Sequence, residues 1–162
     1  MKIVVLTLFI AFCIACTPKQ KHIEPDSFDK EKVTQEIKET LKNYFDDMNN
    51  EGLLSEFKYL DSSEDFFWVP PGFNKRLNYA ETRSVIEDNA PQMLNMDNQW
   101  KSIEIHALSN NFATYTGVVS AKYNDTANMP HNYELIETGV LIKRGNNWKI
   151  LCGQTAQLPK EN

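Results

Sequence analysis

The sequence predicts an α+β domain in which N-terminal helices pack on a strongly bent antiparallel sheet, as in a cystatin-like cone. Before residue 50, apolar residues recur every three or four positions, as on one face of a helix. From Trp100 onward they alternate with polar residues, as in strands. Helices followed by a run of strands are typical of a sheet covered on one face. Gly117 and Gly139 fall inside predicted strands, where glycines permit a sharp bend.

The first helix is predicted from apolar residues at helical spacing between Val33 and Met48. Asp29 is suited to cap its N-terminus, because a carboxylate can accept hydrogen bonds from free backbone N–H groups. Residues 49–52, Asn-Asn-Glu-Gly, have the composition of a helix end. The apolar residues within 53–60 indicate a second, short helix.

A short strand and a third helix come next. Residues 65–69 form a mostly apolar segment that Pro70-Pro71-Gly72 ends. Asn78 and Glu81 have the spacing of a capping box, which predicts the start of a helix. Pro91 is expected to end or kink that helix, since proline lacks the backbone N–H that a helix interior needs.

Four strands are predicted in the C-terminal half. Apolar and polar residues alternate through four segments: 103–107, 112–123, 133–144 and 148–156. Gly145-Asn146-Asn147 is a tight turn between the last two. In the last strand, this alternation places Trp148, Ile150 and Cys152 on one face.

The first residues predict export and a lipid anchor. Lys2 precedes an apolar run from Ile3 to Ala15, which is too short to span a bilayer but suits a secretory signal. Ala15 followed by Cys16 resembles the bacterial lipobox, in which a peptidase cuts just before a cysteine that carries lipid. Cys13 stands where that motif usually has leucine. The alternatives are a plain signal peptide or an uncleaved anchor, with Cys16 incidental.

A lipid on Cys16 would place the protein in the bacterial cell envelope, at the outer membrane or the periplasmic face. Only Cys152 would then remain as a free cysteine, so the domain relies on its apolar core without an internal disulfide. The chain divides into a lipoprotein signal peptide (1–15), the lipidated cysteine with a polar tether (16–28), one domain (29–159) and a tail (160–162).

Charge and residue spacing argue against several functional classes. The net charge of −5, from 22 acidic and 17 basic residues, is unsuited to binding nucleic acid. The three histidines, His22, His106 and His131, have no spacing typical of a metal site, and no Cys-x-x-Cys motif occurs. We therefore expect neither a metal nor a cofactor.

Two stretches of the chain resemble the nuclear transport factor 2-like superfamily. One is the helix, turn and short helix that run into Ser-Glu-Asp-Phe-Phe-Trp-Val-Pro-Pro-Gly at 63–72. The other is the terminal hairpin at 139–150, which ends in Trp-Lys-Ile. The superfamily includes SnoaL-like polyketide cyclases and ketosteroid isomerases, and the resemblance covers about residues 32–158. It implies a cone-shaped sheet around an apolar cavity, but the fold hosts unrelated functions.

The resemblance also implies a ligand pocket lined by Tyr44, Trp68, Tyr115 and Gln154. Apolar walls with a few hydrogen-bonding tips are usual for small-molecule sites. Ketosteroid isomerases carry their general base just before the proline that ends the first strand. That position is Val69 here, and valine cannot accept a proton. Gln154 lies near the place where related enzymes have a histidine, but an amide does not shuttle protons near neutral pH.

We therefore expect a lipid-anchored envelope domain that binds a small apolar or aromatic ligand, or a protein partner, without catalysis. This expectation supposes a cavity without proton-transfer groups. One alternative is a SnoaL-like isomerase, cyclase or hydratase that uses His106, Glu137 or Asp65 together with Tyr44. A second alternative is a dimeric interaction module in which the outer sheet faces of two copies pair.

Overall fold

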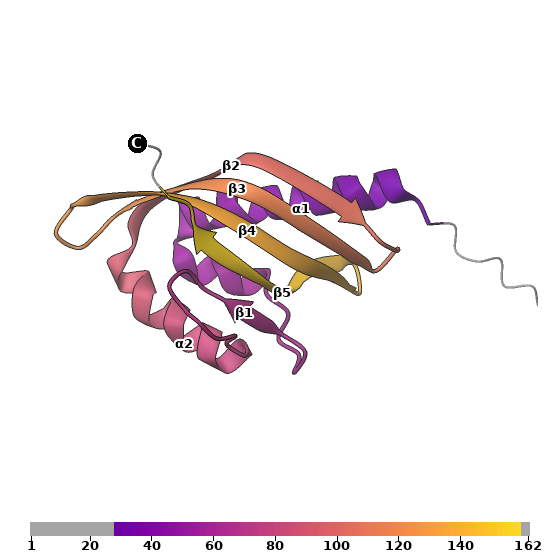
Figure 1. Ribbon diagram of the computed structural model, residues 1–162, viewed down its shortest axis with the longest axis horizontal. Coiled ribbons are helices and arrows are strands. Elements are labelled where there is room, and N and C mark those ends of the chain that lie inside the picture. Colours follow the sequence, from indigo (N-terminus) through magenta and orange to yellow (C-terminus); the bar gives the residue numbers. More distant parts are fainter. Residues whose placement is uncertain (1–27, 160–162) are drawn as a thin grey trace, which may run out of the picture.

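The computed structural model describes residues 28–159 and shows a strongly curled sheet with helices on its concave side (Figure 1). This arrangement confirms the predicted α+β fold class. The elements in chain order are α1 (Lys30–Glu51), η1 (Leu53–Lys58), β1 (Phe67–Val69), α2 (Tyr79–Asn89), η2 (Ala90–Gln92), β2 (Leu94–Ala107), β3 (Phe112–Asn124), β4 (Pro130–Arg144) and β5 (Asn147–Gln157).

The sheet has five strands in the order β1-β5-β4-β3-β2. Strands β2 to β5 form the predicted antiparallel meander. The short β1 runs parallel to β5, with Phe67 opposite Cys152 and Val69 opposite Gln154. The sheet is therefore mixed rather than purely antiparallel. The reason is that the first strand pairs with the last one, so no hairpin joins them and their directions are free to agree.

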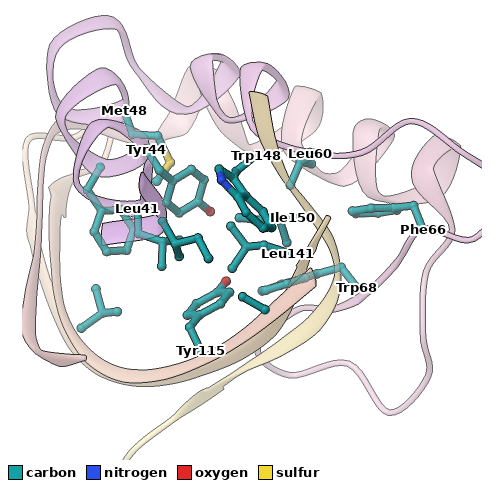
Figure 2. Close-up of a cluster of buried hydrophobic side chains, with 14 of the residues drawn as sticks. Leu41, Tyr44, Met48, Leu60, Phe66, Trp68, Tyr115, Leu141, Trp148 and Ile150 are labelled. Carbon is teal, nitrogen blue, oxygen red and sulfur yellow. The ribbon is translucent and has the colours of Figure 1, made fainter. Parts of the chain in front are cut away.

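Helix α1 covers the concave face and has the predicted ends. Asp29 caps it by accepting a hydrogen bond from the Lys32 backbone N–H at 3.0 Å. The Gly52 N–H donates to the Met48 carbonyl, and the positive φ of Gly52 (+89°) turns the chain out of the helix. The buried residues of α1 follow helical spacing: Val33, Ile37, Leu41, Tyr44, Phe45 and Met48. Figure 2 shows three of them, Leu41, Tyr44 and Met48, in the core between α1 and the sheet.

The sheet bends where large rings cross glycines. The register of β2 with β3 shifts between Trp100 and Ser102, opposite Val118 and Val119 and next to Gly117. A Cβ atom at Gly117 would lie 2.5 Å from the Ser102 carbonyl oxygen and 2.8 Å from the Trp100 ring. At Gly139 it would lie 2.7 Å from the Tyr115 ring. Only glycine leaves room for these contacts, which agrees with the predicted bend.

A bulge in β5 reverses the direction of its later side chains. Leu141 pairs with Ile150, but Val140 pairs with Cys152, so Leu151 is an extra residue. Ile150 is buried before the bulge and Thr155 is buried after it. The strict alternation expected along this strand, with Cys152 on the face of Ile150, is therefore wrong beyond the bulge.

The expected signal segment (1–15), Cys16 and most of the tether lie outside the described residues, as does the tail at 160–162. These assignments stay predictions. Within residues 28–159, no helix has both the length and the apolar character needed to cross a membrane.

Candidate functional site

A pocket of about 220 Å³ lies between α1, η1, β1, α2 and the concave face of the sheet. Two larger grooves, of about 570 and 470 Å³, are lined mainly by polar side chains. The smaller pocket is the better candidate for a ligand site, because small-molecule sites combine apolar walls with a few placed polar groups. Its apolar walls include Phe45, Met48, Trp68, Ile86, Met96 and Val119.

Glu137 from β4 lies inside this pocket and is only 5% exposed. The Tyr115 hydroxyl donates a hydrogen bond of 2.7 Å to Oε1 of Glu137, and the Thr155 hydroxyl donates one of 3.4 Å to Oε2. Burial raises the pKa of Glu137 to about 7 against the lowering effect of the Tyr115 bond, and the charge of Glu56 adds to the rise. The carboxyl can therefore gain or lose a proton near neutral pH.

Glu56 from η1 faces the same pocket. Tyr44 donates a hydrogen bond of 2.8 Å to its Oε1. The residue as a whole is only partly buried, but its carboxyl lies deep enough for burial to raise its pKa to about 7, despite the Tyr44 bond. Burial also raises the pKa of Tyr44 well above its usual value, which keeps that hydroxyl a proton-bearing donor.

The two tyrosines approach the pocket from opposite sides. In Figure 2, Tyr44 descends from α1 and Tyr115 rises from the sheet, with both hydroxyl groups directed into the space between them. Each hydroxyl holds one glutamate, and the charge of Glu56 acts on Glu137. The expectation of a cavity without proton-transfer groups is therefore wrong.

Three further polar residues line the pocket: Thr82 and Asn89 from α2, and Asn98 from β2. Thr82 is 3% exposed, and its hydroxyl has no hydrogen-bond partner among residues 28–159. The backbone of Asn98 exchanges hydrogen bonds of 2.7 and 3.0 Å with the Asn49 side chain. This exchange ties the start of β2 to helix α1 beside the pocket.

Comparison with known proteins supports the fold. No protein-family model and no curated protein sequence matches the chain. A nuclear transport factor 2-like superfamily protein from Salmonella enterica serovar Typhimurium matches its structure with a TM-score of 0.69 at 13% identity, over 82% of this chain and 95% of that one. The chain has the nuclear transport factor 2-like fold. An NTF-2-like protein of unknown function from Shewanella oneidensis matches with a TM-score of 0.61 at 20% identity, over 76% and 98% of the two chains.

The nuclear transport factor 2-like fold also occurs in a protein named "Putative Scytalone Dehydratase" from Novosphingobium aromaticivorans. That structure matches with a TM-score of 0.68 at 13% identity, over 78% of this chain and 84% of that one. At such identities the likeness concerns the fold, and the fold predicted from the sequence resemblance is confirmed. The chemistry has to be argued from the pocket itself.

The expected pocket residues occupy different places in this fold. Tyr44 and Trp68 line the pocket. Tyr115 lies beneath it, 1% exposed, and reaches it through its bond to Glu137. Gln154 lies instead on the exposed side of β5, because the bulge at Leu151 reverses its direction.

The expected catalytic candidates separate in the same way. Glu137 is in the pocket with Tyr44, whereas His106 and Asp65 are exposed. His106 lies on β2 with its Nε2 3.9 Å from the exposed Glu104 carboxylate, and Asp65 precedes β1. Neither reaches the pocket. Within the described part of the chain, no group of three or more His, Cys, Asp or Glu side chains is placed to hold a metal ion.

Glu56 is the ionisable residue of the pocket that the sequence pattern did not single out, and Thr82 and Asn98 were not singled out either. A signal for it exists: Glu56 lies three residues after Leu53 and four before Leu60, at the spacing of the apolar face of a helix. A charged residue at such a position is rarely buried without a reason.

Proposed function

We propose that the protein binds a small, largely apolar molecule in this pocket and transfers protons on it, as an isomerase or dehydratase does. The observation that carries the proposal is the presence of Glu56 and Glu137 in one pocket, each with its pKa raised to about 7. General acid–base catalysis is most effective when the pKa of the group lies near the working pH. Buried carboxyls with ordinary acidity would be poor acids at neutral pH.

The two carboxyls suit complementary roles. The charge of Glu56 helps to raise the pKa of Glu137, and near pH 7 each of the two carboxyls is protonated part of the time. One carboxyl can then accept a proton from a bound molecule while the other supplies one. Tyr115 and Thr155 orient the oxygens of Glu137, and Tyr44 orients Glu56. Glu137 thus supplies an acid–base group that Val69 cannot provide.

Exchange of carbon-bound hydrogen tests this proposal. The full chain would be incubated in D₂O with a panel of small ketones and hydroxyketones, and deuterium entry beside the carbonyl would be followed by NMR. We expect exchange that Glu137→Gln slows by about a hundredfold or more, since a positioned acid or base typically contributes that much. Glu104→Gln, on the exposed side of β2, serves as the matched control. Panel members that bind without exchange would favour binding without catalysis instead.

We also propose that the domain is held at the bacterial envelope by a lipid on Cys16. The apolar run that ends in Ala15-Cys16 supports this location. Cells that express the full chain would be fed a labelled fatty acid. We expect label in the wild-type protein and in Cys152→Ser, but none in Cys16→Ser. Label that persists in Cys16→Ser would contradict the assignment.

A further inference from the structure

The two pocket carboxyls lack a basic partner. The buried Asp61 shows the usual arrangement elsewhere in the fold, because the Arg144 guanidinium donates to it at 2.6 Å. Glu56 and Glu137 are held by neutral hydroxyl groups instead, and no lysine, arginine or histidine lines their pocket within residues 28–159. Buried carboxylates without a counter-charge are costly. When Glu56 and Glu137 are ionised, no basic side chain of the pocket, within the described residues, therefore balances their negative charge.

The rest of the pocket suits an occupant that is both apolar and positively charged. Tyr44, Phe45 and Trp68 offer aromatic surface, which attracts cations as well as apolar groups. The Thr82 hydroxyl is buried at the wall and has no partner there, so it offers a second independent polar contact. The net charge of −5 also favours the approach of a cation over that of an anion.

We infer that the ligand of this pocket is a small aromatic or apolar amine whose ammonium group lies between Glu56 and Glu137. The inference rests on the binding part of the proposed function and names its ligand class. The volume of about 220 Å³ is below the range of about 300–1,000 Å³ typical of drug-sized ligands, so one ring with a short amine chain is the expected size.

Amine binding should be linked to proton release. The titratable groups around the carboxyls are Tyr44 from α1, Tyr115 from β3 and, next to Tyr115, Cys152 from β5. Burial raises the pKa of each of these groups, so all three stay neutral at pH 7 and cannot replace the ammonium charge. Near neutral pH an ammonium group therefore competes with protons held by Glu56 and Glu137.

Three probes of nearly equal shape test the inference: benzylamine, benzyl alcohol and benzoate. Their binding to the full chain in a neutral detergent would be measured by NMR titration at pH 5.5 and pH 8. We expect benzylamine to bind at least tenfold more tightly than the other two at pH 8. We also expect its affinity to fall at least tenfold at pH 5.5, where both carboxyls hold protons. Equal binding of benzyl alcohol, absence of benzylamine binding at pH 8, or affinity that is independent of pH would overturn the inference.

Variants locate the effect and separate it from the proposed catalysis. Glu137→Gln and Glu56→Gln should each weaken benzylamine binding at pH 8 at least tenfold, while Glu104→Gln on the outer face should not. The wild-type pH comparison does not depend on the folding of any variant. Benzylamine binding without any hydrogen exchange on the ketone panel would leave the inference standing and contradict proton transfer. Hydrogen exchange on the ketone panel together with a preference for benzyl alcohol would support proton transfer and overturn the inference of an amine ligand.

Discussion

Glu137 owes its unusual proton affinity to its surroundings and not to its own chemistry. On an exposed strand it would ionise near pH 4.5, but burial beside Glu56 raises its pKa to about 7. Tyr115 opposes this rise by donating to the carboxyl, and so does Thr155. The balance of these effects sets the proton occupancy that the proposed chemistry uses.

The same shift makes folding depend on pH. Between pH 4.5 and about 7 the folded state binds more protons at Glu56 and Glu137 than the unfolded chain does. The free energy of unfolding therefore falls as pH rises through this interval, by on the order of 3 kcal/mol for each carboxyl. Urea denaturation between pH 5 and pH 8 measures this fall. Glu137→Gln should reduce it and stabilise the protein at pH 8, and stability that does not fall toward pH 8 would contradict the raised pKa values of the two carboxyls.

Single elements differ in how far their own sequence determines them. The capping box of α2 follows from Asn78 and Glu81, which exchange hydrogen bonds of 2.9 Å as their spacing predicts. The bulge at Leu151 has no comparable local signal. It arises from the pairing of β5 with β4, since one extra residue must be accommodated where the sheet curls. For that reason the position of Gln154 was not predictable from alternation alone.

Gly153 in β5 shows how closely the edge of the sheet packs. A Cβ atom there would lie 2.3 Å from the Thr138 carbonyl oxygen and 2.5 Å from the Trp68 ring. Gly153→Ala should therefore displace the pocket wall and lower the free energy of unfolding by about 1–3 kcal/mol, as overpacking does. Gly145→Asn provides the control, because the turn there has open space and asparagine tolerates its positive φ of +61°. Equal effects in urea denaturation would disprove the packing argument.

At the scale of the whole molecule, the fold is more predictable than the site. The spacing of the apolar residues and two glycines within strands indicate a bent sheet under a helix. These signals can be read from the sequence because each depends only on neighbouring residues. The placement of Glu56 and Glu137 in one pocket is not local: it depends on η1 docking beside α1 and on the concave face of β4. The residues are 81 positions apart in the sequence. Only tertiary packing brings them to one pocket.

Helix α1 also separates the start of the domain from the pocket. The chain enters α1 at Lys30, whereas Tyr44 reaches the pocket 14 residues further along. At a rise of about 1.5 Å per residue, that separation is about 21 Å along the helix axis. If the proposed lipid on Cys16 anchors the chain, about four turns of α1 therefore separate the pocket from the point where the chain enters the domain.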